Sequence, residues 1–574
     1  MKKLLVYLKG YIKESILGPL FKLLEASFEL LVPIVIKNIV DVGIGKADKS
    51  YIIQMCLLLV LLGVVGLISS VTAQYFAAKA SVGFVTRLRH ELFKHIGQLS
   101  YTEIDTLGTS SMITRMTSDM NQVQTGMNLT LRLLLRSPFI VFGAMIMAFT
   151  VDAKAAVTFV VAIPALFAVV FAIMLLSIPL YKKVQQKLDK VLNTTRENLT
   201  GVRVIRAFGL EEKEIDEFNK RNEELTALQK FVGGISALMN PLTYVIINFA
   251  IIWLIHIGAV RVSAGLLTQG AVLALYNYMS QILIELIKFA NLIISITKAV
   301  ASANRISAVF DMKSSLIEKD TLSKNVKSEY IVEFRNVGLQ YKNAGSESLS
   351  NINFTVRPGE TVGIIGGTGS GKSSLVNMIP RFYEATSGEV IVDGTNVKDY
   401  PLKSLRAKIG IVPQNAVLFK GSIRENMQWG KKDASDEEIM DAISIAQAGE
   451  IVTQKKEGLD FIIEQGGKNL SGGQRQRFTI ARALVKKPEI LILDDSTSAL
   501  DFATDAALRK ALREISGNTT IFIVSQRISS IQHADKIIVL DDGQIAGMGK
   551  HEELLESCEV YREIYDSQFK KEQK

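Results

Sequence analysis

The sequence predicts two fused parts of different fold class. The first is a membrane α-helical domain of six transmembrane helices with long cytosolic extensions, and the second is an α/β domain with much parallel sheet. Apolar stretches of about 20 residues recur through the first half of the chain. From Tyr330 onward, short β-rich runs alternate with helical runs, and one run is followed by a glycine-rich loop. The predicted boundaries are 1–310 for the helical domain, 311–328 for a polar linker and 329–574 for the α/β domain.

Length and composition agree with this division. A chain of 574 residues is too long for one core, and 48% hydrophobic with 21% charged residues suits a membrane part joined to a soluble part. The net charge of +9 does not predict a nucleic-acid partner, because Lys and Arg gather beside the apolar stretches, as on cytoplasmic flanks of membrane helices. The two cysteines, Cys56 and Cys558, exclude a disulfide framework and fit a reducing cytosolic face.

The apolar stretches predict six spans, each about the 20 residues that a helix needs to cross the hydrocarbon of a bilayer. They lie at about 16–36, 52–73, 130–150, 155–179, 240–260 and 268–296. Basic residues gather in the connections after the second and fourth spans, which predicts cytosolic termini in the cell membrane. The N-terminal segment lacks a cleavage site, so we expect a short amphipathic helix on the cytosolic membrane surface.

The connections after the second and fourth spans are about 50 residues long and have helical periodicity, so the membrane helices are predicted to project into the cytosol. Each projection turns at a short polar segment, at 107–111 with Arg115 and Asp119, and at 197–203. The pattern alone allows two interpretations of these tips: docking on a cytosolic domain, or a solvated helical hairpin.

Charged residues inside the spans are costly and need a cavity or a protein partner. Those of the first and sixth spans are Lys22, Glu25, Glu29, Glu285 and Lys288. Their helical spacing allows two interpretations, a polar stripe that lines a chamber through the membrane, or mutual pairing. Arg132 and Arg136 lie near the inward end of the third span, where we expect them to snorkel towards water.

The most specific motif is the glycine-rich loop, which follows an apolar strand at 361–365 and precedes a helical run. Strand, loop and helix in this order predict a phosphate-binding P-loop. Main-chain N–H groups can surround phosphate oxygens, Lys372 can neutralise the β- and γ-phosphates, and Ser373 can hold Mg²⁺. The predicted ATP-binding residues are Gly366, Gly367, Thr368, Gly369, Ser370, Gly371, Lys372, Ser373 and Ser374.

A second apolar strand, at 490–493, ends in two carboxylates. The carboxyl end of a strand beside the phosphate site is where a Mg²⁺ partner is needed, and Asp494 takes this position. Asp495 follows it, at the natural position for a group that orients the attacking water.

Between these motifs stands the five-residue signature Leu470, Ser471, Gly472, Gly473 and Gln474. With its flanking motifs, the chain resembles a bacterial ABC exporter half-transporter of the type IV, multidrug-exporter-like fold, over essentially its whole length. The resemblance implies a P-loop ABC ATPase domain that uses ATP and Mg²⁺ and drives transport across the lipid bilayer. It also implies a second exporter half, whose ATP the signature of this chain contacts across a head-to-tail dimer.

The resemblance extends to other positions. Tyr341 matches the aromatic residue that stacks on adenine, and Gln414 matches the glutamine that touches Mg²⁺ or water. Residues 498–501 resemble the D-loop, and residues 201–208 resemble the second coupling segment of exporters, which favours the docking interpretation of the tips.

Two positions depart from the family pattern. The residue after the Mg²⁺ aspartate is usually glutamate, and here it is Asp495; the switch histidine is replaced by Gln526. Aspartate is one methylene shorter, and a misplacement of about an ångström can cost ~100-fold in rate. Glutamine cannot titrate or carry positive charge as histidine does. Both changes together resemble the degenerate-site subunit of a heterodimeric exporter.

The leading hypothesis is therefore a half-subunit that moves amphipathic drugs, peptides or lipids out of the cytoplasm. Its own site would be weakly hydrolytic, and its signature would complete the partner's active site. One alternative is a homodimeric exporter or lipid flippase, and another is a non-transporting regulator that binds ATP. The sequence predicts neither the substrate nor the identity of the partner chain.

Overall fold

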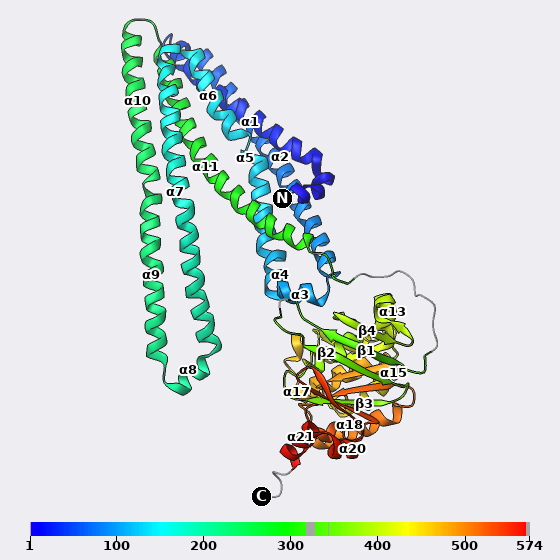
Figure 1. Cartoon of the computed structure of the whole chain (residues 1–574). Helices are drawn as coiled ribbons and strands as arrows, with labels where there is room; N and C mark the ends of the chain where they lie inside the picture. Colours follow the sequence, from blue (N-terminus) through cyan, green and yellow to red (C-terminus); the bar gives the residue numbers. More distant parts are fainter. Residues whose placement is uncertain (1, 317–327, 343, 570–574) are drawn as a thin grey trace. The chain divides into compact units, whose positions relative to one another are not determined.

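The computed structural model describes residues 2–316, 328–342 and 344–569, and its contacts divide the chain into two compact units (Figure 1). The first unit comprises Met1–Gly97 and Thr109–Met312, and the second comprises Gln98–Gly108 and Lys313–Lys574. The second unit thus includes a short segment that the sequence places inside the helical domain. Most of the predicted 311–328 linker lies outside the described residues.

The first unit is built of long helices. They are α1 (Ile12–Asn38), α2 (Lys49–Ile96), α5 (Met120–Leu133), α6 (Arg136–Val151), α7 (Ala153–Thr200), α9 (Glu211–Ala237), α10 (Met239–Ser263) and α11 (Gln269–Asp311). Shorter pieces are the 3₁₀-helix η1 (Lys2–Tyr11), the π-helices η2 (Ile39–Ile44) and η3 (Arg115–Asp119), and the helices α4 (Thr109–Thr114) and α8 (Val202–Phe208). The predicted N-terminal helix is therefore present as a 3₁₀-helix. In Figure 1, α9 and α10 run beside α7, and α8 joins α7 to α9.

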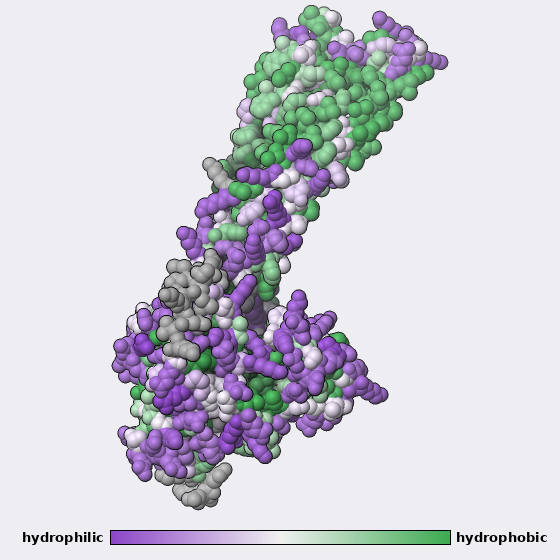
Figure 2. Space-filling model, turned by 90° about the vertical axis from the view of Figure 1, so that its right-hand side faces the viewer, coloured by the Kyte–Doolittle hydropathy of each residue, from purple (hydrophilic) through white to green (hydrophobic). Residues whose placement is uncertain are grey.

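Five helical stretches of the described chain are long and apolar enough to cross a membrane. They are Lys49–Ile96, Thr109–Val151, Ala153–Thr200, Glu211–Ser263 and Gln269–Asp311. The remaining predicted span is the first, at 16–36, and it coincides with α1, which is 27 residues long but carries several charges in its apolar sequence. Figure 2 shows apolar side chains in one band over the first unit, bounded by hydrophilic side chains, as expected of a surface that faces lipid.

Arg136, at the start of α6, does not snorkel, so that prediction is wrong. Its side chain is only 7% exposed and donates from Nη1 to Glu285 Oε1 of α11 and from Nη2 to Glu29 Oε2 of α1, both at 2.6 Å. Ser137 Oγ donates to the second Glu285 oxygen at 3.0 Å. The two carboxylates from neighbouring helices compensate the guanidinium inside the protein, so the side chain has no need to reach for water.

The remaining membrane charges predicted from the sequence are also paired. Lys288 Nζ lies 2.9 Å from Glu285 Oε1, and Lys22 Nζ lies 2.5 Å from Glu25 Oε2. Lys22 also donates to Ser70 Oγ of α2 at 3.1 Å. The geometry therefore agrees with the pairing interpretation of these residues.

The two predicted tips form short helices. The first, α3 (Tyr101–Leu107), belongs to the second unit and ends at Gly108, whose φ of 72° suits glycine. Tyr101 packs against Phe382, Glu103 accepts from Ser315 N, and Asp105 accepts from Tyr383, all upstream of the predicted 107–111 turn. The second tip is α8, which follows Gly201 and has no buried residue in the described structure.

The second unit contains a six-stranded sheet in the order β12-β11-β3-β10-β9-β6 and a four-stranded sheet in the order β2-β1-β4-β5. In the larger sheet β11, β3, β10, β9 and β6 are parallel, and β12 joins one edge antiparallel. The strands are β1 (Val332–Leu339), β2 (Leu349–Val356), β3 (Thr361–Gly366), β4 (Ser387–Val392), β5 (Thr395–Asn396), β6 (Ile409–Val412), β9 (Ile490–Asp494), β10 (Thr520–Val524), β11 (Lys536–Asp541) and β12 (Gln544–Gly549). A separate pair consists of β7 (Gly421–Ser422) and β8 (Ile462–Ile463).

Helices flank the strands of this unit. They are α12 (Lys372–Met378), α13 (Leu402–Lys408), α14 (Ile423–Gln428), α15 (Asp436–Ile445), α16 (Gly449–Thr453), α17 (Gly472–Leu484), α18 (Phe502–Ile515), α19 (Ile528–Ile531), α20 (His551–Ser557) and α21 (Glu559–Phe569). Every residue of β9 and β10 is buried, which explains their continuous apolar sequences, since parallel strands are covered on both faces. The carboxyl ends of β3, β9 and β10 lie side by side and carry the predicted site residues.

Candidate active site

The loop after β3 has the backbone of a phosphate cradle. Gly366 and Gly371 have φ values of 158° and 91°. A Cβ at Gly371 would lie 2.6 Å from Leu349 Cδ2 and 2.9 Å from the Ser348 carbonyl oxygen, so only glycine fits this close approach. The sequence therefore curls tightly between β3 and α12, as a loop that presents main-chain N–H groups to phosphate must do.

Lys372 is the first residue of α12, and its ammonium lies over the loop. Its Nζ donates to the carbonyl oxygens of Gly366 at 2.9 Å and Gly367 at 2.6 Å. Burial lowers the pKa of Lys372, while the Asp495 and Asp494 carboxylates act in the opposite direction. The ammonium is thus held beside the cradle, where it can neutralise phosphate oxygens.

Ser373 and Asp494 form the oxygen pair expected of a Mg²⁺ site. Ser373 Oγ donates to Asp494 Oδ1 at 2.9 Å across the ends of α12 and β9. Burial raises the pKa of Asp494, an effect that the Ser373 hydrogen bond opposes and the neighbouring Asp495 charge reinforces. A hydroxyl and a carboxylate are the hard oxygen ligands that Mg²⁺ prefers, and a cation here would relieve the repulsion between the adjacent carboxylates.

Asp495 and Gln526 follow β9 and β10 on neighbouring strands. Asp495 has a φ of 45°, a left-handed conformation that aspartate tolerates better than most residues. Gln414 Nε2 lies 3.5 Å from Asp495 Oδ2, at the limit of a hydrogen bond. The Gln526 side chain is exposed, and its main-chain carbonyl accepts a hydrogen bond from Gln568 Nε2 at 2.7 Å.

These residues line one cavity of about 360 Å³. Its predicted members are Tyr341, Thr368, Gly369, Gly371, Lys372, Ser373, Ser374, Gln414, Asp494, Asp495 and Gln526. The structure adds Ser348, Val524 and Ser525, which no sequence motif marked. Residues from six separate stretches of the chain thus converge on a single volume, within the range of ~300–1,000 Å³ typical of small-molecule sites.

Tyr341 closes one side of the cavity. Its hydroxyl lies 2.9 Å from Ser374 Oγ, and burial raises its pKa. Its ring packs edge-to-face on Tyr383, with centroids 5.0 Å apart and an interplanar angle of 86°. Tyr383 Oη in turn donates to Asp105 of α3 at 2.6 Å, so one aromatic pair joins the cavity wall to α3. Sequence reasoning missed Tyr383, because an aromatic residue after a helix is ordinarily assigned to the core.

The signature residues lie elsewhere in the unit. Ser471 caps α17, accepting from Gln474 N at 3.3 Å, while Gln474 Oε1 accepts from Ser471 N at 3.0 Å. None of the five signature residues lines the 360 Å³ cavity in the described structure. In the next turn of α17, buried Gln476 donates to Ser498 Oγ at 3.3 Å and accepts from Ala499 N at 3.0 Å. Gln476, another residue that sequence reasoning missed, thus ties the signature helix to the segment after Asp495.

Fold and site together define a membrane protein fused to a P-loop nucleotide-binding unit. The ABC transporter transmembrane region family matches residues 15–286, and the ABC transporter family matches residues 349–498. The ABC transporter ATP-binding protein YfiB of Bacillus subtilis (strain 168) is 36% identical over 574 residues, covering 100% of this chain and 99% of the relative. This chain belongs to the ABC transporter family, as a half-transporter that carries both domains on one polypeptide.

Other relatives carry more specific names. The putative multidrug export ATP-binding/permease protein YgaD of Bacillus subtilis (strain 168) is 33% identical, covering 99% of both chains. The ATP-dependent lipid A-core flippase of Hahella chejuensis (strain KCTC 2396) is 32% identical, covering 86% of this chain and 84% of the relative. A bacterial Atm1-family ABC exporter with ATP bound shares the fold, with a TM-score of 0.80 at 24% identity and 98% coverage of both chains.

These findings confirm the predicted fold class, the resemblance to half-transporters and the class of ATP-hydrolysing transporter. They also make the chain a multi-pass membrane protein. From here on, the first unit is called the membrane unit and the second unit the cassette.

Proposed function

We propose that this chain is one half of a heterodimeric exporter in which its own nucleotide site binds ATP but hydrolyses it slowly. The observation that carries the proposal is the pair Asp495 and Gln526, which line the cavity where the family usually has glutamate and histidine. Three groups needed for binding remain beside them, namely Lys372, Ser373 and Asp494.

Binding follows from the geometry of the cradle. Tyr341 would stack on adenine, the loop amides and Lys372 would hold the phosphates, and Ser373, Asp494 and Gln414 would hold Mg²⁺. Mg²⁺ supplies neutralisation of charge on the phosphate oxygens.

Hydrolysis depends on the groups that have changed. A general base or water-positioning group must lie within hydrogen-bond reach of the attacking water. The Asp495 carboxylate is one methylene closer to its backbone than a glutamate would be, and its Oδ2 faces the Gln414 amide. Gln526 can donate a hydrogen bond to the γ-phosphate, but its amide stays neutral at every physiological pH. Both groups would leave the phosphate bound and the water poorly oriented.

The signature would act on the second chain. Its residues stand at the start of α17 and outside this chain's own cavity, so a partner cassette placed head-to-tail would receive them. Leu470, Ser471, Gly472, Gly473 and Gln474 would thereby complete the partner's active site.

The membrane unit would carry the transported molecule. We infer that both termini and the cassette are cytoplasmic, since basic residues gather on that side, and that α3 and α8 dock on cassettes. The proposed boundaries are 1–310, 311–328 and 329–574. The proposed substrates are amphipathic drugs, peptides or lipids moved out of the cytoplasm, in keeping with the names of two relatives.

The test uses the full heterodimer, whose second half is sought in the neighbouring reading frame, and a photoreactive ATP analogue. We expect the label on this chain to remain triphosphate while the label on the partner becomes diphosphate. Lys372→Ala should remove the label from this chain alone. The loss of a charged phosphate contact of ~3 kcal/mol should lower the ATP affinity of this site by about 100-fold. Lys456→Ala, at an exposed lysine of the same unit, is the matched control. Equal hydrolysis at both sites would overturn the proposal.

A second candidate is a homodimeric exporter or lipid flippase, favoured by the 32% identity to the lipid A-core flippase. The chain purified alone decides between them. Substantial ATPase activity from a homodimer supports the second candidate, whereas activity that needs another half supports the first.

A further inference from the structure

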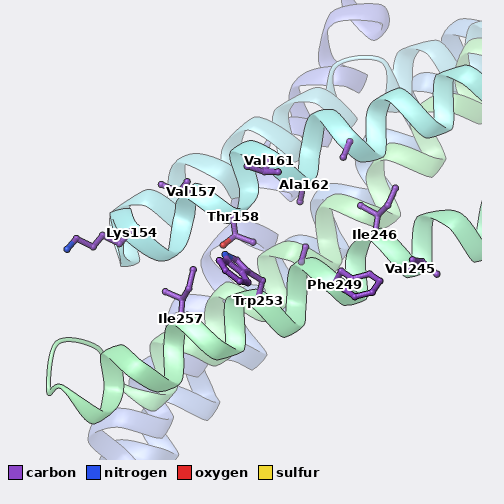
Figure 3. A pocket seen from close by; sticks show the side chains of 12 residues that line it. Lys154, Val157, Thr158, Val161, Ala162, Val245, Ile246, Phe249, Trp253 and Ile257 are labelled. Carbon is purple, nitrogen blue, oxygen red and sulfur yellow. The ribbon is translucent and has the colours of Figure 1, made fainter.

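A groove of about 640 Å³ runs between α7 and α10 of the membrane unit, away from the nucleotide cavity (Figure 3). Its walls are almost wholly apolar, with Val157 and Val161 on α7 facing Phe249, Trp253 and Ile257 on α10. A volume of this size and lining is typical of sites for small molecules rather than of packing defects.

Two polar residues interrupt the apolar lining, and both lie near the start of α7. Thr158 is only 7% exposed, and its Oγ1 has no hydrogen-bond partner within the described chain. In Figure 3 this hydroxyl points into the groove, opposite Trp253. A buried hydroxyl without a partner is unfavourable, so its position indicates that a bound molecule supplies the missing hydrogen-bond partner.

Lys154 stands one helical turn before Thr158, at the mouth of the groove. Its side chain is exposed and forms no ion pair with any residue that the structure describes. The nearby carboxylate of Asp152 is already engaged, with Oδ2 2.7 Å from Arg261 Nη2. The mouth of the groove therefore carries an uncompensated positive charge.

The spacing of these groups matches one leaflet of a bilayer. From Lys154 to Ala165, the groove follows eleven residues of α7, or about 16 Å at ~1.5 Å per residue. Half of the ~30 Å hydrocarbon core is about the same length. Lys154 lies beside the short connection between α6 and α7, at the level of lipid headgroups, and the apolar lining extends from there into the membrane.

We propose that this groove binds an anionic phospholipid, with the phosphate on Lys154, an ester oxygen accepting from Thr158 Oγ1, and one acyl chain along Phe249 and Trp253. An apolar helix from a second chain would cover the same wall but leave both polar groups without partners. The inference rests on the proposed function in one respect only: the cytoplasmic cassette makes this the outer leaflet.

The fluorescence of Trp253 provides a direct test, because the chain has only one other tryptophan, Trp429. The full chain carrying Trp429→Phe is reconstituted into phosphatidylcholine vesicles that contain either brominated phosphatidylglycerol or brominated phosphatidylcholine. We expect brominated phosphatidylglycerol to quench Trp253 at roughly fivefold lower mole fraction, the preference that one lysine near an anionic headgroup confers.

Two variants assign the preference to the groove. Lys154→Gln should abolish it, whereas Thr158→Val should weaken quenching by both lipids at least about twofold and leave the preference in place, since both lipids carry the ester oxygen; folding should not suffer, because the lost hydroxyl has no partner in the described structure. Lys49→Gln is the matched control, an exposed lysine at the start of α2 that does not line the groove, and it should keep the full preference.

Equal quenching by the two lipids would overturn the inference. An equal loss of the preference in Lys49→Gln would overturn it as well, because the preference would then come from surface charge alone. Absence of quenching by either lipid would mean that a partner helix covers the groove, and this result would also overturn the inference. The readout requires no ATP hydrolysis, so its failure leaves the proposal for the nucleotide site standing. Brominated phosphatidylglycerol confined to one leaflet shows separately whether the groove lies in the outer leaflet.

Discussion

Arg136 in the membrane unit is enclosed by Glu29 and Glu285, whereas Lys372 in the cassette rests on main-chain carbonyls at the edge of an open cavity. Arg136 is buried and Lys372 is partly buried, and their partners differ in kind. Opposite charges already neutralise Arg136, while Lys372 has only neutral oxygens within hydrogen-bond distance in the described structure. The first arrangement holds helices together, and the second leaves a charge ready for an anionic ligand.

The largest expected effect concerns the signature. Gly472→Asp places a carboxylate where the partner's phosphates should lie, and should lower heterodimer ATPase activity by about 10²–10³-fold. The chain itself has room for the change, since a Cβ at Gly472 lies 3.6 Å from Ala499 Cβ, an ordinary contact. Gly517→Asp, at an exposed glycine with open space around it, is the control and should retain the parental rate. An unchanged rate in Gly472→Asp would remove the role in the partner's site.

The next effect concerns the enclosed arginine. Arg136→Ala leaves Glu285 buried beside Glu29, and should destabilise the membrane unit by about 3–5 kcal/mol. Adding Glu285→Gln should recover part of that loss, because it removes a buried carboxylate that has lost Arg136 and keeps only the more exposed Lys288 as an ion-pair partner in the described structure. Thermal unfolding in detergent measures both variants, and Lys288→Ala, whose side chain is 46% exposed, should change stability by less than about 1 kcal/mol. If Arg136→Ala proved as mild as Lys288→Ala, the ion network would contribute nothing to the fold.

A smaller effect separates docking from nucleotide binding. Tyr383→Phe removes the hydrogen bond to Asp105, worth about 1.5–3 kcal/mol when the acceptor is charged. We expect ATP affinity to stay within about twofold, while the ATP consumed per molecule transported rises. Tyr400→Phe removes a comparable hydroxyl, bonded to the Val392 carbonyl oxygen in the core, and should leave that ratio unchanged. Equal ratios in the two variants would exclude a docking role for Tyr383.

The contrast between the two units also explains which parts of the fold and of the site could be predicted from the sequence. Around Lys372 and Ser373, a local motif of glycines between a strand and a helix determines the geometry, so most of the cavity lining was predictable, although the predicted residues Gly366, Gly367 and Ser370 do not line it. Asp494 and Asp495 were predictable because parallel strands bring their carboxyl ends to one edge.

Tertiary partners were not predictable in the same way. Arg136 meets Glu285 across 149 positions of sequence, and Tyr383 meets Asp105 across 278. No local pattern encodes such pairs, because they depend on how separate helices pack. The groove at Thr158 was missed for the same reason, since a threonine in an apolar span carries no sign of whether its hydroxyl will find a partner.

The account depends most on the claim that Asp495 and Gln526 keep this site slow. The direct measurement is ATPase activity of a heterodimer whose partner site has been disabled at its catalytic carboxylate, with Asp495→Glu and Gln526→His introduced together in this chain. We expect the rate to rise by about tenfold or more, with each single change doing little, because groups that act as a unit are not additive. An unchanged melting temperature shows that the longer side chain is tolerated at the left-handed backbone of residue 495. A well-folded double variant with the parental rate would contradict the account, because some other group would then keep the site slow.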